Sequence, residues 1–338
     1  MRLLVVTQKV DASDPILGFF HRWIAEFAAQ CESVIVIGQY VTDFHLPPNV
    51  KVLSLKKERG SWRITQVLRY RWLLWKYRRE YDAIFVHMTP IWGVFAWRMV
   101  IFFRKPLYLW YEARGTRWPL KVAVWLATKV FSASAAGMPI KTSKSVITGH
   151  GIAVDTSAFD TSAMVRDVHL VVTVGRITAS KNLPVIIHAF ETLPQESRLF
   201  LAGAPLTSDD HALLSRLRLM FHQKGMEHRV EVRSLSQQEV ASMLKKAALF
   251  LHASSTSLDK ALLEAMASGC LVVSCAEAAR SVLPKECLAT PEGMGDRAKT
   301  LLALPPEEQD ALRGKLRELV VKDHSLPRLI ERLMEEMS

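Results

Sequence analysis

One loop of this 338-residue chain combines a glycine, an arginine and a lysine at a spacing suited to holding phosphates. The apolar run at residues 169–174 (HLVVTV) predicts a buried strand, which leads into Gly175 and Arg176, with Lys181 at the start of the next predicted helix. Arginine offers a planar fork of N–H donors and lysine a point charge, so the two could clamp a diphosphate. By itself this spacing is weak evidence, because loops carry such residues by chance.

A second stretch, residues 248–275, predicts a strand, a turn, a helix and another strand. Residues 248–252 are an apolar run of strand length, and residues 254–257 form a turn rich in hydroxyls. Residues 260–268 predict a short helix, and residues 271–275 a second buried strand rich in β-branched side chains. This order is a βαβ unit, and the first loop of the unit ends at a helix N-terminus.

The ends of that short helix are marked by the residues around it. Ser257 or Asp259 can serve as N-cap, and Gly269 ends the helix. The unpaired backbone N–H groups and the positive end of the helix dipole favour an anion there, typically a phosphate.

Strands and helices alternate along the whole chain, which predicts an α/β protein with parallel sheets and helices on both faces. The first units are a strand at residues 2–7, a helix at 19–30 and a strand at 33–38. Ligands bind at the carboxyl ends of the strands in such sheets. Further strands are expected at residues 82–88, 107–111, 130–134, 146–148, 198–202 and 229–232.

Several residues of the N-terminal half qualify for a site by position alone. Gly18 ends the loop after the first strand, where it lets the backbone approach a ligand or simply makes a turn. The other candidates lie at or near strand ends, where an ordinary structural role fits equally well: His21, His87, Glu112 and Arg114.

Charge is distributed unevenly. Residues 1–150 carry 22 Lys and Arg against 9 Asp and Glu, whereas residues 151–338 carry 22 against 24. The basic half points to a partner with phosphates, such as a membrane surface, a nucleic acid or an anionic substrate. Residues 59–81 interleave aromatic and cationic side chains, which suits a helix lying on anionic lipid or a helix with its aromatics in the core. Nucleic acid is the weakest of these readings, because no known binding module accompanies the charge.

No segment predicts export or membrane insertion. The first ten residues meet a charge at Lys9, too early for a signal peptide, and the longest apolar stretch, residues 91–103, contains Arg98 and is too short to span a bilayer. The four cysteines form no CxxC pair and are expected to be core thiols in a reducing compartment. We therefore expect a cytoplasmic protein.

Three motifs occur in an order that resembles a known family. Residues 171–190 (VVTVGRITASKNLPVIIHAF) are followed by residues 262–273 (LLEAMASGCLVV), and residues 149–159 (GHGIAVDTSAF) precede both. In this combination the chain resembles the retaining glycosyltransferases of the GT-B fold, family 4, over essentially its whole length. The resemblance implies two Rossmann-like domains with parallel sheets facing across a cleft, and a C-terminal helix that crosses back. The expected domains are residues 1–163 with 325–338, on the acceptor side, and residues 164–324, which bind the nucleotide-sugar.

The resemblance also assigns roles to residues. Arg176 and Lys181 would hold the donor diphosphate and stabilise it as the leaving group, beside Gly175. Glu264 would accept hydrogen bonds from the ribose, and Gly18 would lie beneath the diphosphate. The backbone from Leu258 to Lys260 would cap the distal phosphate or the sugar. No metal or cofactor is expected, since the chain has no DxD cluster and the two cations would replace Mg²⁺.

Two departures from the family pattern concern the sugar side. Many relatives have a glutamate where this chain has Thr256, so Asp259 would supply a polar group there and Lys260 a third cation. Many also have a histidine after the strand at residues 107–111, where Glu112 and Ala113 stand here. Retention of configuration is implied by the family, through front-face attack assisted by the departing phosphate.

The expected function is transfer of a sugar from a nucleotide-diphosphate sugar to a cell-surface polysaccharide or a lipid-linked acceptor. An anionic membrane contacted by residues 59–81 is a separate candidate partner. Two alternatives remain open. One is a non-catalytic relative that acts as a binding or scaffold subunit, and the other is a related enzyme such as a nucleotide-sugar epimerase. The sequence does not name the sugar, the base or the acceptor.

Overall fold

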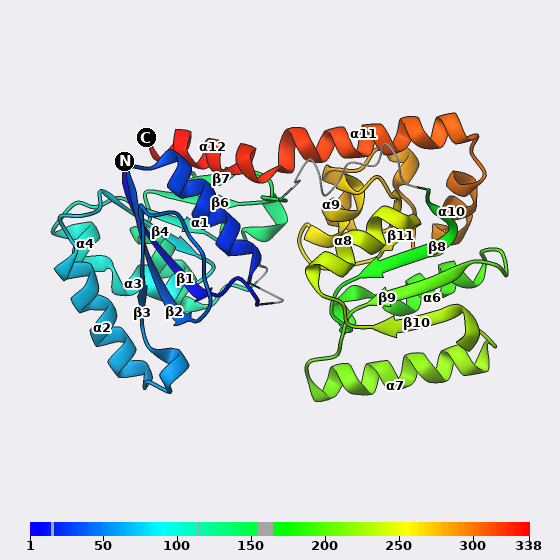
Figure 1. Cartoon of the computed structure of the whole chain (residues 1–338), viewed down its shortest axis with the longest axis horizontal. Helices are drawn as coiled ribbons and strands as arrows, with labels where there is room; N and C mark the ends of the chain where they lie inside the picture. The colour runs from blue at the N-terminus through cyan, green and yellow to red at the C-terminus, as the bar shows by residue number, and fades with distance from the viewer. Residues whose placement is uncertain (15–16, 114, 154–164) are drawn as a thin grey trace. The chain divides into compact units, whose positions relative to one another are not determined.

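The computed structural model describes residues 1–14, 17–113, 115–153 and 165–338, and the chain divides into two compact units (Figure 1). The first unit comprises Met1–Ala153 and Leu326–Ser338, and the second comprises Val154–Ser325. Each unit is built around a parallel sheet. Arg114 and residues 154–164, which include part of the glycine-rich segment and of the expected linker, lie outside the described residues.

The sheet of the first unit has seven strands in the order β3-β2-β1-β4-β5-β6-β7. Side chains alternate between its faces: Leu4 and Val6 point to one and Leu3 and Val5 to the other, all fully buried. Burial on both faces is what a parallel sheet with covering helices requires. The strands are β1 Arg2–Val10, β2 Ser33–Val41, β3 Val50–Ser54, β4 Ala83–His87, β5 Leu107–Trp110, β6 Lys129–Ser132 and β7 Ser145–Ile147.

Different helices cover the two faces of this sheet. One face packs against α2 (Arg63–Lys76), α3 (Pro90–Phe95), α4 (Trp97–Ile101) and α5 (Trp118–Leu126). The other face packs against α1 (Phe19–Gln30) and the last helix, α12 (Leu326–Met337). The Tyr108 hydroxyl donates to the Met337 carbonyl at 3.0 Å, which fastens α12 to β5. The C-terminal helix thus returns to the first unit, as expected.

The sheet of the second unit has five strands in the order β10-β9-β8-β11-β12. Both sheets therefore share the 3-2-1-4-5 order of Rossmann-like folds, with the order reversing at the first strand of each unit. The strands are β8 Asp167–Val174, β9 Arg198–Ala202, β10 Val230–Arg233, β11 Ala247–His252 and β12 Leu271–Ser274. The helices are α6 Leu183–Glu191, α7 Ser208–Gln223, α8 Gln237–Lys246, α9 Lys260–Ala267, α10 Met294–Leu302 and α11 Pro306–His324.

Some elements differ from the sequence-based expectation. Strand β3 was not predicted, because it lies at the sheet edge and has no fully buried residue to form an apolar run. The apolar segment at residues 89–103 is two short helices joined at Ala96, and the side chains at its end are exposed. The strand fragment expected at residues 287–289 is a 3₁₀ turn, Lys285–Cys287, and a single bridge from Ser274 to Leu288.

The cysteines and the lengths of the helices bear on two further sequence-based expectations. All four cysteines are free thiols, and Cys31, Cys270 and Cys287 are buried. In the described part of the chain, every helix is too short or too polar to cross a membrane.

Candidate active site

The loop after β8 is shaped by two glycines. Gly175 has a φ of +144°, and a Cβ added there would lie 2.6 Å from Lys181 Cε. A Cβ on Gly203, which follows β9, would lie 1.9 Å from the Gly175 carbonyl oxygen. The backbones of the two loops therefore touch, so Gly203 has no room for a side chain, and the backbone of Gly175 has a φ that residues with a Cβ rarely adopt.

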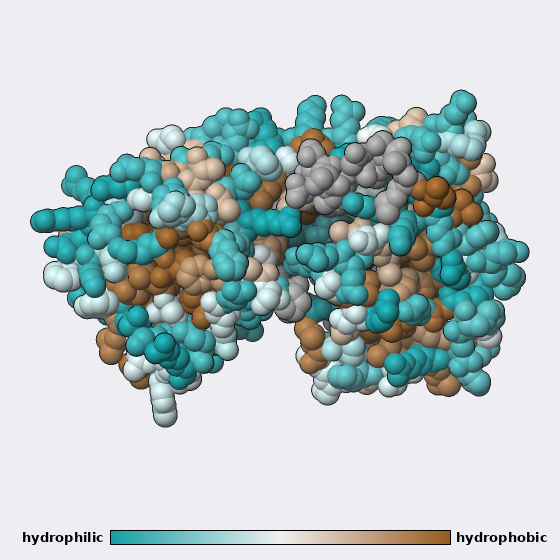
Figure 2. Space-filling model, viewed as in Figure 1, coloured by the Kyte–Doolittle hydropathy of each residue, from teal (hydrophilic) through white to brown (hydrophobic). Residues whose placement is uncertain are grey.

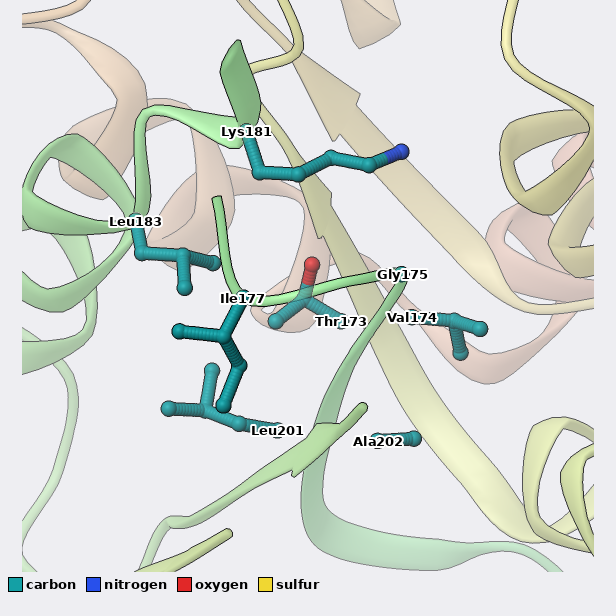
Figure 3. A pocket seen from close by; sticks show the side chains of 8 residues that line it. All are labelled: Thr173, Val174, Gly175, Ile177, Lys181, Leu183, Leu201 and Ala202. Carbon is teal, nitrogen blue, oxygen red and sulfur yellow. The ribbon is translucent and has the colours of Figure 1, made fainter. Parts of the chain in front are cut away.

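A pocket lies at this carboxyl end of β8 and β9 (Figure 3). Most of its lining is apolar, and the Thr173 hydroxyl and the Lys181 ammonium group are the side-chain polar atoms among the lining residues. In Figure 3 the Lys181 side chain extends above the other lining side chains. The lining residues are Thr173, Val174, Gly175, Ile177, Lys181, Leu183, Leu201 and Ala202.

Lys181 forms an ion pair with Asp259, the N-cap residue of α9. Only 18% of the Lys181 side chain and 13% of the Asp259 side chain are exposed. Asp259 Oδ1 also accepts a hydrogen bond from the Ala261 backbone N–H at 3.3 Å. One carboxylate thus occupies the positive end of α9 and pairs with the cation of the β8 loop.

A buried histidine stands behind this ion pair. The Nε2 atom of His252 lies 3.5 Å from Asp259 Oδ2, and its Nδ1 atom lies 2.8 Å from the Ser274 hydroxyl. Burial by itself would raise the pKa of Asp259, but the neighbouring His252 ring and the charge of Lys181 outweigh burial and hold the pKa well below its usual range. Asp259 is therefore an anion at neutral pH.

Two further charged groups lie along α9. Burial lowers the pKa of Lys260 and raises the pKa of Glu264 to about 7, and the charge of Lys260 partly opposes the second shift. Asp259 and Lys181 also act on Glu264, the first raising and the second lowering its pKa. Lys181, Asp259, Lys260 and Glu264 therefore form one electrostatic cluster.

Hydrogen bonds tie the β8 loop to the β11 loop. The Ser255 N–H donates to the Ser180 carbonyl at 2.8 Å, and Asn182 Nδ2 donates to the Ala253 carbonyl at 2.9 Å. Asn182 itself has a left-handed backbone with φ of 48°. These contacts join parts of the chain more than 70 residues apart and position Lys181 against α9.

The remaining donor-side candidates lie in these same two loops. Arg176 is exposed between β8 and the 3₁₀ turn Ala179–Lys181. The Thr256 hydroxyl lies 2.8 Å from the Ser254 hydroxyl, and Leu258 is buried ahead of α9. The structure thus gathers Lys181, Asp259, Lys260 and Glu264, with Arg176 in the loop that carries Lys181; the roles of these residues in binding stay predictions.

The first-unit candidates have structural partners within their own unit. Gly18 is the N-cap residue of α1, and a Cβ there would lie 2.5 Å from the Asp14 carbonyl oxygen, so the loop itself requires glycine. His87 is buried, and its ring stacks on Phe20 with centroids 3.9 Å apart. The His45 backbone N–H donates to His21 Nε2 at 3.0 Å.

Glu112 holds the loop after β6. Its carboxylate accepts hydrogen bonds from the Ser132 hydroxyl at 2.7 Å, from the Ala133 N–H at 2.7 Å and from the Ser134 hydroxyl at 2.9 Å. This carboxylate positions a loop at the carboxyl end of the sheet. Arg114, the last acceptor-side candidate, lies outside the described residues.

Sequence reasoning missed His252, Ser274, Asn182 and Gly203. His252 and Ser274 are the last residues of β11 and β12 and stand opposite each other in the parallel register. His252 ends a predicted strand and Ser274 lies one residue before the end of another, so the argument that selected Arg176 applies equally to them. The described residues hold no group of three or more His, Cys, Asp or Glu side chains suited to a metal ion.

One family model matches the part of the chain that contains the site. Residues 168–320 match the model of the family glycosyl transferases group 1, and this range contains the whole cluster from Gly175 to Glu264. The chain has no match among curated proteins.

Solved structures resemble the chain over its full length. HepE (Alr3699) of Anabaena in complex with UDP and glucose is 16% identical with a TM-score of 0.73, covering 100% of this chain and 99% of that one. Sucrose-phosphate synthase of Thermosynechococcus elongatus is 17% identical with a TM-score of 0.78, covering 99% and 98%. The lipopolysaccharide outer core galactosyltransferase WaaB is 14% identical with a TM-score of 0.69, covering 100% and 99%. At these identities the likeness establishes the fold, which is GT-B: two Rossmann-like units with parallel sheets.

Proposed function

We propose that this protein is a glycosyltransferase that takes its sugar from a nucleotide-diphosphate donor. The observation that carries the proposal is the cluster at the carboxyl end of β8, where Lys181 and Arg176 share a loop and Glu264 lies on the facing helix α9. The family match covers all three residues. The structure of HepE contains UDP and glucose, which supports a nucleotide-sugar as donor.

The two cations of the β8 loop act on the leaving group. When the bond from the sugar to the diphosphate breaks, negative charge grows on the phosphate oxygens, and Arg176 and Lys181 stabilise it. Because these charges take the part that Mg²⁺ plays elsewhere, we propose that the reaction needs no metal. The bond from the acceptor oxygen to the sugar forms on the face from which the diphosphate leaves, with retention of configuration, and the departing phosphate takes the proton of the acceptor hydroxyl.

Before a donor binds, Asp259 occupies the place beside Lys181 and the N-terminus of α9. Its carboxylate pairs with Lys181 and caps α9, which are the two positions that a phosphate would prefer. A donor diphosphate therefore competes with Asp259 for Lys181. Glu264 in its ionised form accepts hydrogen bonds from the ribose, and the backbone from Leu258 to Lys260 faces the distal phosphate or the sugar.

We propose a cell-surface polysaccharide or a lipid-linked precursor as acceptor, and the cytoplasmic face of the membrane as the place of reaction. The support is segment 59–81, whose helix α2 turns Tyr70 and Leu73 to the core and leaves Trp72 and Trp75 half exposed beside cations. The two interpretations of this segment, a helix lying on anionic lipid and a helix with its aromatics in the core, thus apply to different faces of one helix. An anionic membrane is the partner that these aromatics and cations fit.

The test is incubation with a panel of UDP-, GDP- and ADP-sugars while nucleotide release is followed. We expect release with at least one donor and its loss in Arg176→Ala, but not in Arg216→Ala, an exposed arginine of α7. Absence of both turnover and binding for every donor would contradict the proposal. Donor binding without nucleotide release would favour a non-catalytic scaffold subunit, and an altered sugar without any acceptor would indicate an epimerase. Nucleotide release that survives Arg176→Ala would contradict the role proposed for Arg176.

A further inference from the structure

The tryptophans of this protein are unusually placed. All nine lie within the first 125 residues, and five of them are at least half exposed. Trp side chains are normally well buried, and they are enriched where a protein meets the interface of a bilayer. The five are Trp62, Trp72, Trp75, Trp118 and Trp125, with exposed fractions of 82, 50, 54, 63 and 70%.

Helix α2 carries the first exposed patch as a stripe. Ile64, Leu68, Trp72 and Trp75 follow one another at intervals of four, four and three residues, which places them on one face of the helix. The opposite face is buried through Tyr70 and its neighbours. In Figure 2 hydrophobic and pale residues stand beside hydrophilic ones over α2, at the lower left.

A second patch lies on α5 and at the end of α4. Trp118, Lys121 and Trp125 are three and four residues apart, so they share one exposed face of α5. Three consecutive apolar side chains at the end of α4 are also exposed: Ile101, Phe102 and Phe103. This patch lies outside segment 59–81.

Both patches belong to one layer of helices. Tyr70 of α2 packs edge-on against Trp92 of α3 with centroids 4.9 Å apart. A Cβ on Gly93 of α3 would lie 3.6 Å from Ala123 Cβ of α5, so these two helices are also in contact. The helices α2 to α5 cover the same face of the first sheet, and each patch is on the solvent side of that layer.

The layer is strongly basic. Residues 59–125 contain 13 Lys and Arg and only three acidic residues, all of which have partners. Asp82 pairs with Arg2, Glu80 with Lys51, and Glu112 holds the β6 loop. Two of the cations lie over exposed rings, Lys76 over Trp72 at 4.8 Å and Arg78 over Trp75 at 4.4 Å.

We propose that α2, the end of α4 and α5 together form one docking surface for an anionic bilayer, with two separate apolar contacts. The inference rests on the proposed location at a membrane and does not depend on sugar transfer. Positive charge attracts acidic headgroups, while the two sets of tryptophans enter the interface. Contact at two points fixes the orientation of the first sheet relative to the membrane, which a single helix would leave free to roll.

The experiment measures co-sedimentation with phosphatidylcholine vesicles that contain or lack phosphatidylglycerol, at low and high salt. Trp72→Ser with Trp75→Ser tests the first patch, and Trp118→Ser with Trp125→Ser tests the second. Leu206→Ser with Leu219→Ser, two half-exposed residues of the second unit, is the matched control. We expect each tryptophan pair to weaken binding about tenfold and the control to bind normally.

Charge reversal tests the electrostatic part. Arg63→Glu with Lys121→Glu should weaken binding to acidic vesicles about tenfold and flatten its salt dependence, whereas Arg216→Glu with Arg218→Glu should not. Thermal unfolding of the tryptophan variants should match that of the parent chain, because the side chains are exposed.

Three results would overturn the proposal: absence of binding to acidic vesicles, equal binding to neutral ones, or full binding by the Trp118 and Trp125 variant. A dimer in light scattering that the tryptophan changes dissociate, without effect on vesicle binding, would instead make the surface an interface between copies. Nucleotide release in solution is measured separately, so failure on vesicles and failure of the proposed transferase activity are distinguishable.

Discussion

The two units place opposite charge patterns at the same point of the same topology. In the first unit Lys9, near the end of β1, pairs with two acids of the loop that follows, Asp11 at 2.9 Å and Asp14 at 2.6 Å. In the second unit the loop after β8 carries Arg176 and Lys181, and Asp259 is the acid paired with Lys181. One cation thus meets two acids at the end of β1, whereas two cations and one acid lie together at the end of β8.

This difference shows why overall charge is a poor guide to a binding site. The first unit contains the basic excess, but many of its cations lie on the outer helices, while two acids surround the one cation at the end of β1. The second unit is nearly neutral, yet it concentrates cations beside a helix N-terminus. A diphosphate is recognised by local charge at a strand end, whereas a bilayer responds to charge spread over a surface.

The largest expected effect comes from removing a cation of the second loop. Lys181→Ala should lower turnover by about 10²–10³, because the ammonium group no longer stabilises the departing diphosphate. Lys9→Ala, at the matching place in the first unit, should change donor affinity little. Nucleotide release from a donor sugar measures both variants. Equal losses of turnover in the two would contradict the claim that the donor diphosphate is held by the second unit.

The glycines of the two loops give the next effect, on stability. Gly203→Ala should lower the free energy of unfolding by roughly 1–3 kcal/mol, because the new Cβ would lie 1.9 Å from the Gly175 carbonyl oxygen. Gly18→Ala should destabilise similarly through Asp14, so loss of activity in that variant would not by itself show contact with a donor.

Gly314→Ala is the control for both changes. It lies in α11 with nothing within 4 Å of the added Cβ, and it should stabilise the chain by about 0.5–1 kcal/mol. Chemical denaturation followed by circular dichroism measures all three variants. An unchanged stability in Gly203→Ala would mean that the loops of the second unit do not touch as described.

Most of the architecture follows from local patterns. Helix α1 was predicted with its observed bounds, and α9 with Asp259 as one of two N-cap candidates, because apolar spacing and caps act over a few residues. Strand β3 lacked such a pattern, since an edge strand with no buried side chain has no apolar run. The loop with Gly175, Arg176 and Lys181 could be located because the apolar run of the preceding strand predicts where the loop begins.

The contacts of these residues could not be predicted from the sequence. Lys181 and Asp259 are 78 residues apart in the chain, so only the fold brings them together. The role of Glu112 in holding residues 132–134 is equally remote in sequence. The alternation of aromatic and cationic residues in segment 59–81 could not show which rings face outward, because that depends on where the sheet lies.

Donor affinity should depend on pH through Glu264. Its pKa is raised to about 7, chiefly by burial, and the ionised carboxylate accepts much stronger hydrogen bonds from a ribose than the neutral acid does. Affinity for the donor sugar should therefore fall as the pH decreases below 7, approaching about tenfold per pH unit. Above 7, loss of the proton from Lys260, whose pKa is lowered by burial, should weaken the affinity again.

Calorimetric titration across this pH range measures the dependence. In Glu264→Gln the fall on the acid side should disappear, because the amide does not titrate, and the fall on the basic side should remain. If the affinity of this variant still falls below pH 7, the titrating group is not Glu264.

The smallest expected effect belongs to the acid of the second loop. Asp259→Asn removes the carboxylate that competes with phosphate for Lys181, so nucleoside diphosphate affinity should rise by roughly twofold to fivefold. Turnover should nevertheless fall, because Lys181 loses the group that positions it. Asp11→Asn in the first unit should leave both quantities unchanged, and weaker nucleotide binding in Asp259→Asn would show that the carboxylate helps to hold the donor.

The most direct test is a crystal structure with a nucleoside diphosphate bound. We predict that the phosphate oxygens lie within hydrogen-bonding distance of Lys181 Nζ and the Arg176 guanidinium, with the ribose hydroxyls on Glu264. A nucleotide bound at the β1 loop of the first unit, or away from all three side chains, would contradict the assignment.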